Sequence, residues 1–412
     1  MNPDAVAARR AVESLRSGVP SRYAVAQLGT TQYEIKLRFQ EDLDALVEGK
    51  SVSPLVVAAN FGAGKTHLLE YLQTLAERMN CVTSYVVVSP EMPLGNAHVV
   101  LKAIAESSRA PGRTGKALRA LMSDFSTASP EYAEVREWSR TAGLQDSFNA
   151  ILHLYAEFRA DETFRGQLLE DIEGKVLVKT LLKGRLKEIG QAAAYDLGAI
   201  RGSRKSPELA HERIRLLAQL FRAAGCHGIV VLFDELERIA KFSLKQRAAA
   251  YQELAWWQEA AQRSGGAILP VFAMTEEFLD SYITGGKRDA QKFVSVALGQ
   301  AVDEREERAS RGIDVLTSYA LLSSPDSRQI EEIKYRVKAL YETAYSVSVC
   351  AVDTRPDRTS IRSEIRRWIT LWDMQRYDPD YVPQILEETI RFDESQISDE
   401  SLSTDEDEGS AE

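Results

Sequence analysis

Cysteine is scarce in this chain, which has only three among its 412 residues: Cys81, Cys226 and Cys350. They are widely spaced, and none stands at metal-ligand spacing from another, so the sequence predicts neither a disulfide framework nor a zinc site. We expect the three thiols at small apolar core positions, and a reducing compartment fits such sparse use of cysteine.

Long apolar runs are missing as well. No stretch approaches the roughly 20 apolar residues that a membrane-spanning helix needs, and residues 1–18 lack the apolar segment of a signal peptide. We therefore expect a cytoplasmic protein that does not enter a membrane. With 412 residues the chain is long enough for two or three domains, or for one elaborated α/β domain with extra modules.

Basic residues are absent from the last part of the chain, residues 393–412, which carries nine acidic groups. The formal net charge of −10 therefore falls almost wholly on this tail, and the rest of the chain is near neutral. So few apolar residues cannot offset the entropy of ordering, and the tail is predicted to be disordered. It is either a solubilising extension or a mimic of nucleic acid that folds back on a basic surface.

Helical periodicity marks both ends of the remaining chain. Apolar spacing predicts helices over 4–15 and 32–47, which form an N-terminal lead-in over residues 1–50. Residues 326–392 are expected to form a small helical C-terminal module, which contains the segment IRSEIRRWITLW. From about residue 100 to residue 224 the pattern is again overwhelmingly helical, which indicates a long insertion between two strands.

Short runs of β-branched residues between these helical parts indicate buried strands. The first run leads through a glycine-containing loop into a helix over 67–79, and a second strand follows. A strand, a loop, a helix and a strand in this order begin a parallel α/β sheet. The core over residues 51–325 thus contains five predicted strands, at 54–59, 81–89, 228–233, 266–274 and, more weakly, 315–322.

The loop after the first predicted strand has the composition of a phosphate-binding loop. Small residues let backbone N–H groups approach phosphates, Lys65 reaches the β and γ phosphates, and the hydroxyl of Thr66 ligates Mg²⁺. Position 59 departs from the usual pattern, because alanine stands there in place of glycine. We expect the chain to bind ATP with Mg²⁺ here and to hydrolyse it. The predicted nucleotide-binding residues are Asn60, Phe61, Gly62, Ala63, Gly64, Lys65, Thr66 and His67.

Two adjacent acids end the third predicted strand. Because ligands of open parallel sheets bind at the carboxyl ends of the strands, Asp234 and Glu235 are expected beside the phosphate-binding loop. Asp234 would hold Mg²⁺ and Glu235 would polarise the attacking water, with Glu237 as the alternative base. Thr275 ends the fourth strand, where it either hydrogen-bonds the water that attacks the γ-phosphate or only caps the helix that follows.

Two groups of arginines are candidates for contact with the phosphates. Arg305, Arg308 and Arg311 precede the fifth strand, where an arginine that acts on a neighbouring subunit's nucleotide would lie. Arg362 and Arg366 stand one helical turn apart on one face of a C-terminal helix, from which either would reach the nucleotide of the same subunit. For each group the alternative is a solvated surface charge.

Basic residues also form a stripe within the predicted helical insertion. Such a stripe would follow a nucleic-acid backbone and make DNA binding salt-dependent. Because no aromatic residues are interleaved, a solvated helix face is favoured over DNA binding. The stripe and the loop after it contain Lys175, Lys179, Lys183, Arg185, Lys187, Arg201, Arg204 and Lys205.

Along the chain come a phosphate-binding loop, a helical insertion, a strand that ends in two acids, a strand that ends in threonine, and a helical module with arginines. This order of motifs resembles that of the AAA+ ATPases, in the branch of origin-recognition and initiator clamp-loader types. The lead-in RRAVESLRSGVPSRYAVAQLG, the loop FGAGKTHLL, the strand VVLFDELERI and the helix RSEIRRWI are together similar to the ATP-binding proteins of BREX-type bacterial phage-defence systems. The resemblance covers about residues 8–375. It implies a parallel sheet in the order 5-1-4-3-2, a helical or winged-helix lid over 326–392, and Gly18, Val19 and Arg22 against the adenine.

The same resemblance implies a homo-oligomer around shared nucleotide sites, which acts on DNA or on partner phage-defence proteins. Two functions stay open at this point. One is an ATPase whose turnover drives or resets a DNA-bound assembly, and the other is a nucleotide-dependent switch or scaffold in which slow hydrolysis is a timer. A small-molecule kinase is disfavoured, because the long insertion follows the second strand and no acceptor-binding constellation is evident.

Overall fold

The structure is a computed structural model, and it describes residues 3–18, 21–60, 62–175, 177–197, 206–263, 265, 267–285, 289, 292, 304–350, 360–378 and 381. Some of the predicted features lie outside these residues. They are Val19, Phe61, the loop cations Arg201, Arg204 and Lys205, and the acidic tail 393–412.

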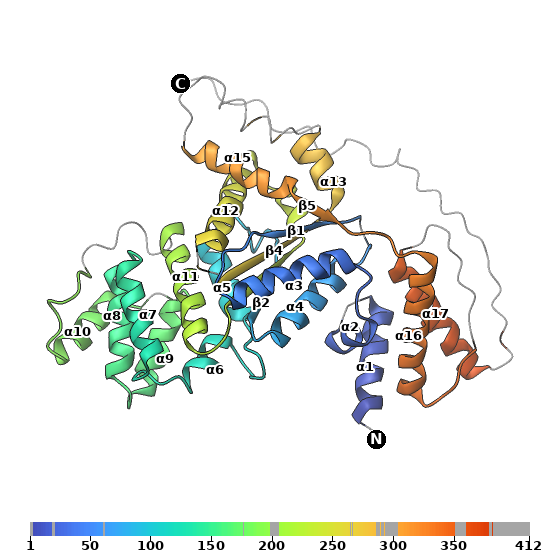
Figure 1. Ribbon diagram of the computed structural model, residues 1–412, viewed down its shortest axis with the longest axis horizontal. Coiled ribbons are helices and arrows are strands. Elements are labelled where there is room, and N and C mark those ends of the chain that lie inside the picture. The colour runs from blue at the N-terminus through green and yellow to red at the C-terminus, as the bar shows by residue number, and fades with distance from the viewer. Residues whose placement is uncertain are drawn as a thin grey trace, which may run out of the picture.

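A parallel sheet lies at the centre of the molecule (Figure 1). Within the described residues its strands are β1 (Leu55–Ala58), β2 (Val82–Val87), β3 (Ile229–Asp234), β4 (Ile268–Met274) and β5 (Tyr319–Leu321). Their spatial order is β2-β3-β4-β1-β5, which from the other edge is 5-1-4-3-2. Every neighbouring pair is parallel, so the strands all end at the same edge of the sheet. The predicted α/β class with a five-stranded parallel sheet is confirmed.

Helices cover both faces of this sheet, which explains why β1, β3 and β4 are buried at every position. Alternate residues of each strand enter separate hydrophobic cores, with Val57 and Val230 in one core and Val56 and Val231 in the other. The first core includes α3 (Tyr33–Val47) and α4 (Lys65–Arg78), and the second includes α12 (Leu244–Arg263) and α15 (Glu304–Thr317).

The chain between β2 and β3 forms a group of helices that extends from the sheet to one end of the molecule (Figure 1). Two of these helices begin with a serine cap followed by proline, at Ser129 and at Ser206, which is a strong helix-start signal. The core of this group is continuous with the core on the α12 face of the sheet. The helices are α5 (Ala97–Ser107), α6 (Ala117–Met122), α7 (Pro130–Thr141), α8 (Asp146–Glu157), α9 (Glu162–Ile172), α10 (Lys179–Glu188) and α11 (Pro207–Ala223).

Helices from the two ends of the chain pack together at the other end of the molecule (Figure 1). They are α1 (Pro3–Ser17), α2 (Arg22–Leu28), α16 (Ser327–Tyr345) and α17 (Ile361–Tyr377). Their shared core contains Val12, Leu340 and Trp368 and is separate from the two cores of the sheet. We call these four helices the terminal module. The helices α1 and α2 thus belong with the C-terminal helices, whereas α3 packs on the sheet.

The fifth strand begins later than the sequence indicates. Residues 315–317 lie in α15, and β5 has only three residues, 319–321. Val315 and Leu316 are buried with Ile313 in the core on the α12 face, so their apolar character reflects helix packing and not a strand. The predicted start of this strand at residue 315 is wrong. In the described part of the chain, no helix combines the length and the apolar character needed to cross a membrane.

Candidate nucleotide-binding site

The chain leaves β1 and turns back through two glycines before α4 begins at Lys65. Gly62 has a φ of +79° and Gly64 a φ of +100°, and this left-handed region favours glycine over residues with a Cβ. A Cβ on Gly62 would also lie 3.2 Å from Cβ of Ser360, the N-cap residue of α17. The phosphate-binding loop therefore lies against the start of the last helix of the terminal module.

Lys65 has a nearly buried side chain inside this loop. Its Nζ lies 3.4 Å from the carbonyl oxygen of Ala59 and 3.9 Å from Oε1 of Glu237. Ala59 is fully buried in the same core as α3 and α4, and it is not among the residues with positive φ, so the backbone there does not require glycine. Asn60 is exposed, and its carbonyl accepts a hydrogen bond of 3.2 Å from the N–H of Ala63.

The carboxylate of Asp234 collects three hydrogen bonds at the carboxyl edge of the sheet. Its Oδ2 accepts one from Oγ1 of Thr66 at 3.1 Å and one from the hydroxyl of Tyr85 at 2.6 Å, and its Oδ1 accepts one from the N–H of Glu235 at 2.8 Å. The structure thus brings together the two predicted metal ligands, Thr66 and Asp234. Tyr85 was not among the predicted site residues, because a strand pattern does not tell which polar side chain reaches a neighbouring strand.

The two glutamates after Asp234 have different surroundings. Glu235 adopts the left-handed conformation, with φ +59°, and its carboxylate pairs with Arg238 near the surface. A non-glycine residue in that region is uncommon and indicates a constrained turn. Glu237 lies on the 3₁₀ helix Leu236–Lys241 with its carboxylate toward Lys65, and burial raises its pKa above the usual value. The turn therefore brings Glu237 to the lysine and pairs Glu235 with Arg238.

Thr275 follows β4 directly, next to the strand that leads into the phosphate-binding loop. The carbonyl of Met274 accepts a hydrogen bond of 3.2 Å from the N–H of Ala59. Thr275 has extended backbone angles and occupies the N-cap position of α13 (Glu276–Phe278), but its side chain makes no capping hydrogen bond. Thr275 therefore stands at the cap position of the helix but does not cap it through its side chain.

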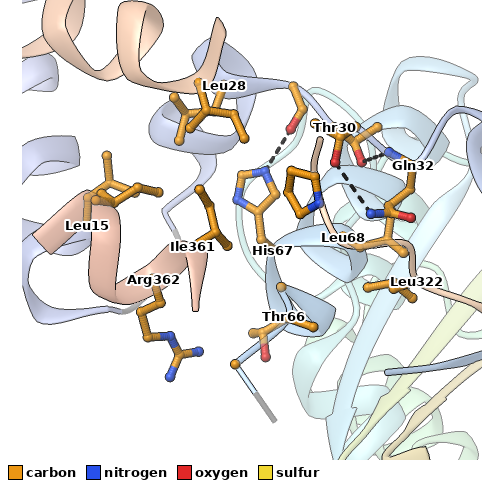
Figure 2. A pocket seen from close by; sticks show the side chains of 18 of the residues that line it. Leu15, Leu28, Thr30, Gln32, Thr66, His67, Leu68, Leu322, Ile361 and Arg362 are labelled. Carbon is orange, nitrogen blue, oxygen red and sulfur yellow. Dashed lines mark hydrogen bonds between the residues drawn. The ribbon is translucent and has the colours of Figure 1, made fainter. Parts of the chain in front are cut away.

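An open pocket adjoins the phosphate-binding loop, with about 920 Å³ of empty space that includes open solvent (Figure 2). The loop and the first turn of α4 form one wall through Gly62, Thr66 and His67. The residues 29–32 after α2 form a second wall. Apolar side chains from the terminal module and from the segments beside it complete the lining: Leu15, Leu28, Leu322, Ile333, Ile361 and Ile365. A cavity with an apolar part and a phosphate-binding loop suits a nucleotide.

Hydrogen bonds hold the 29–32 loop between α4 and the segment after β5. Nε2 of His67 lies 2.7 Å from the carbonyl oxygen of Gly29, and burial lowers the pKa of His67, so a neutral ring that donates from Nε2 fits this contact (Figure 2). The amide of Gln32 both donates to the carbonyl of Ser323, at 2.8 Å, and accepts from its N–H, at 3.0 Å. His67 therefore holds the 29–32 loop against α4, which is a structural role.

The two arginines of α17 lie beside the end of α1. Nη2 of Arg366 donates a hydrogen bond of 2.7 Å to the carbonyl of Ser17, and a Cβ on Gly18 would lie 2.5 Å from the same nitrogen. Arg362 lines the cavity together with Gly18 and Thr66 (Figure 2). Arg362 is therefore the arginine of this pair that borders the candidate site, and Arg366 joins α17 to α1.

The arginines of α15 contact another helix of the same chain. Arg308 and Arg311 both pair with Glu259 of α12, at 3.7 Å and 3.0 Å, and they are not among the residues that line the cavity. The carbonyl of Arg305 accepts a hydrogen bond from Gln252. Within one chain these arginines therefore do not contribute to the cavity.

Arg22 does not line the cavity either. It makes two hydrogen bonds, of 3.1 Å and 2.7 Å, to the carboxylate of Glu77. Glu77 is near the end of α4, twelve residues and about 18 Å along the helix from Lys65. Of the lead-in residues expected near the adenine, Gly18 borders the cavity and Arg22 joins α2 to α4.

The basic stripe of the insertion is only partly available to a ligand. Arg185 pairs with Asp161 and Glu188, and Lys175 pairs with Glu170. On α10, Lys183 and Lys187 are exposed to solvent. The stripe is therefore interrupted by ion pairs, and its exposed part is short.

The chain matches the sequence model of a known protein family. The sequence model of the family described as BREX system ATP-binding protein BrxC/D matches residues 5–180 and 200–367, which is most of the chain. This match confirms the resemblance to BREX-type ATP-binding proteins. The curated proteins and the solved structures contain no match to this chain.

Proposed function

The chain belongs to the family of BREX system ATP-binding proteins, BrxC/D, and on this premise we propose that it binds ATP with Mg²⁺ and hydrolyses it beside the phosphate-binding loop. The observation that carries the proposal is the hydrogen bond from Thr66 to Asp234 at the carboxyl end of β3, with Lys65 beside Thr66 at the start of α4. Phosphoryl transfer relies mainly on positioning and on charge stabilisation, and these three groups supply both.

The side chains at this edge suit a Mg²⁺ ion. Oγ1 of Thr66 and Oδ2 of Asp234 are 3.1 Å apart, and Mg²⁺ prefers oxygen ligands, commonly one or two from the protein with the rest from phosphates and water. Thr66 and Asp234 would therefore hold the ion, directly or through water. Bound there, Mg²⁺ would neutralise charge on the β and γ phosphates of ATP.

Other residues of the site have roles that follow from their positions. The backbone N–H groups at the start of α4 face the loop, so they and the helix dipole would attract phosphate oxygens. Lys65 would exchange its contacts with Ala59 and Glu237 for the β and γ phosphates. Arg362, which is on the terminal module, would bind a phosphate of the nucleotide. Thr275 would orient the attacking water.

We assign the role of general base to Glu235, with Glu237 as the alternative. Glu235 follows the metal-binding Asp234 at the strand end, but its carboxylate pairs with Arg238 and would have to leave that partner to polarise water. Glu237 already faces Lys65 from a buried position. Glu235→Gln and Glu237→Gln should separate the two, because only the variant that lacks the base binds ATP normally without turning it over.

The test of the proposed activity is ATP binding and turnover by the purified full chain, with and without DNA. Lys65→Ala is expected to lose ATP binding, and Glu235→Gln is expected to bind ATP without hydrolysis. Lys50→Ala, at an exposed position, is the matched control for loss of a lysine. A wild-type chain that binds no ATP would contradict the proposal.

A second candidate function, a nucleotide-dependent switch or scaffold, is favoured by the way the cavity is built. Residues of α1, α16 and α17 line it, and these helices join the two ends of the chain in one module. A ligand that contacts both the module and α4 would stabilise their docked arrangement. If partner binding requires ATP and persists in Glu235→Gln, the switch is supported; if partner binding requires turnover, it is not.

We further propose that the protein is a cytoplasmic homo-oligomer that works with DNA or with other BREX proteins. The arginines of α15, Arg308 and Arg311, have side chains that are 34% and 49% exposed, which leaves them within reach of a neighbouring subunit. Mass measurement with and without ATP tests the oligomer. Replacement of Lys183 and Lys187 by alanine should weaken DNA binding and its salt dependence if α10 contacts the backbone.

A further inference from the structure

Tyr85 is a residue near the candidate site to which the proposed function assigns no role. Its hydroxyl donates a hydrogen bond of 2.6 Å to Oδ2 of Asp234. Tyr85 lies on β2, two residues before Val87, which is the register partner of Asp234 on the neighbouring strand. Its ring is partly buried against the core shared by α3 and α4, and α4 carries Thr66. The tyrosine therefore approaches the metal-binding edge from the β2 side.

Tyr85 is one of several hydrogen-bond donors that surround the carboxylate of Asp234. A carboxylate has about four positions at which it accepts hydrogen bonds or metal ions. In Asp234, which is only 4% exposed, three of them are taken, by Tyr85, by Thr66 and by the N–H of Glu235. The three donors thus fix the orientation of the carboxylate. They also fix the direction of the remaining lone pair, which is on Oδ1.

Tyr85 and Thr66 differ in how firmly they hold this carboxylate. The hydroxyl of Thr66 rotates freely and is itself an expected Mg²⁺ ligand, so its bond to Asp234 is the weaker constraint. The hydroxyl of Tyr85 is on a ring packed in the core. A phenol is protonated at neutral pH, so this hydroxyl donates its hydrogen bond to Asp234.

We propose that Tyr85 is a positioning residue for Mg²⁺, because its hydroxyl orients the carboxylate of Asp234 and thereby sets the affinity of the site for the ion. The inference rests on the proposed binding of ATP with Mg²⁺. Groups that orient a metal ligand in this way typically change metal affinity by roughly tenfold or more when they are removed.

The test uses the full chain and Tyr85→Phe, which removes the hydroxyl and keeps the ring. Binding of Mn²⁺ is followed by electron paramagnetic resonance in the presence of a non-hydrolysable ATP analogue, and binding of a fluorescent ATP analogue is measured in EDTA. We expect Mn²⁺ to bind roughly tenfold more weakly to Tyr85→Phe, with analogue binding in EDTA unchanged. Tyr71→Phe, on α4 and against the same core, is the matched control and should leave both unchanged.

A double-mutant cycle with Asp234→Asn shows whether Tyr85 acts through the carboxylate. In the Asp234→Asn background, Tyr85→Phe should cause little further loss of Mn²⁺ affinity. An unchanged Mn²⁺ affinity in the single variant, or an equal loss of analogue binding with and without metal, would overturn the inference. If the wild-type chain and Tyr85→Phe bind the analogue and Mn²⁺ equally well, only the inference about Tyr85 is overturned. If the wild-type chain binds no analogue, the proposed function is overturned as well.

Discussion

Ala59 is the residue at which the phosphate-binding loop departs from the usual glycine. Its side chain is fully buried in the core shared by β1, α3 and α4, and its N–H bonds to Met274 as if the strand continued. The glycines that the turn requires stand later, at 62 and 64, where φ is positive. The loop therefore keeps its conformational freedom where the phosphates would bind, and the methyl of Ala59 adds to the core.

Restoring glycine at this position should accordingly give no gain in binding. We expect Ala59→Gly to lower the free energy of unfolding by about 1–2 kcal/mol, through the lost methyl and the added chain entropy, and to leave ATP affinity unchanged. Gly64→Ala, which puts a Cβ at a φ of +100°, should instead weaken ATP binding. Urea unfolding and ATP titration check both variants. Clearly tighter ATP binding by Ala59→Gly would show that the alanine constrains the site.

Arg238 is a second residue whose removal has a defined outcome. It pairs with Glu235, the proposed base, and both side chains are more than a third exposed. Because exposed ion pairs contribute roughly 0.2–1 kcal/mol, we expect Arg238→Ala to raise ATP turnover by at most about fivefold. Lys241→Ala on the same 3₁₀ helix is the control. Steady-state turnover measures the effect, and a fall in turnover would mean that Arg238 assists the reaction.

At the scale of elements, the sequence predicted the features that depend on local pattern. The runs that became β1, β3 and β4 are buried on both faces, so they are continuously apolar, and the glycines of the loop after β1 mark its turn. The local sequence pattern did not predict α2, whose seven residues form a helix because Ala24, Val25 and Leu28 are buried by neighbouring helices. It also misplaced the start of β5, because apolar residues at the end of α15 match either structure.

The helix α3 contains a buried acid that makes stability depend on pH. Burial raises the pKa of Asp42 to about 6, although Arg38 opposes the shift, and Oδ2 of Asp42 has no hydrogen-bond partner among the described residues. The native chain therefore holds this proton more tightly than the unfolded chain does. The resulting stability is present in full below pH 4 and is lost as the pH rises through 6.

Asp42→Asn should remove this dependence. At pH 7 we expect the variant to be more stable than the wild type by roughly 1–2 kcal/mol, a figure reduced for the partial exposure of the group, and at pH 4 the difference should shrink. Urea unfolding at the two pH values measures it, with Asp44→Asn, an exposed acid of the same helix, as the control. A stability difference that does not change with pH would contradict this account.

At the scale of the whole molecule, the union of α1 and α2 with α16 and α17 could not be predicted from the sequence. Each helix has an apolar face, but no local pattern tells which of several apolar faces it meets across more than 300 residues of chain. The same limit applies to Tyr85 and to the 29–32 loop, whose contacts with Asp234 and His67 join separate elements. Arg362 and Arg366 were predicted together from their shared helix face, and only Arg362 lines the cavity, so which of them contacts a phosphate stays a prediction.

This union predicts that a residue far from the cavity controls nucleotide binding. Trp372 is fully buried in the terminal module, packs on Tyr341 with ring centroids 5.5 Å apart, and does not line the cavity. Trp372→Ala should cost about 3–5 kcal/mol within the module, which is enough to loosen α1 and α17 and to weaken ATP binding by an order of magnitude or more. Met374→Ala, whose side chain is exposed on the same helix, should change neither.

Hydrogen exchange of the full chain, measured with and without ATP, tests the same prediction directly. In the wild type, ATP should slow exchange in α1, α16 and α17 together, because one ligand contacts a module that docks as a unit. In Trp372→Ala these three helices should exchange faster even without ATP, while β1 and β3 keep their protection. If Trp372→Ala binds ATP as tightly as Met374→Ala does, the phosphate-binding loop alone supplies the affinity, and the terminal module is not part of the nucleotide site.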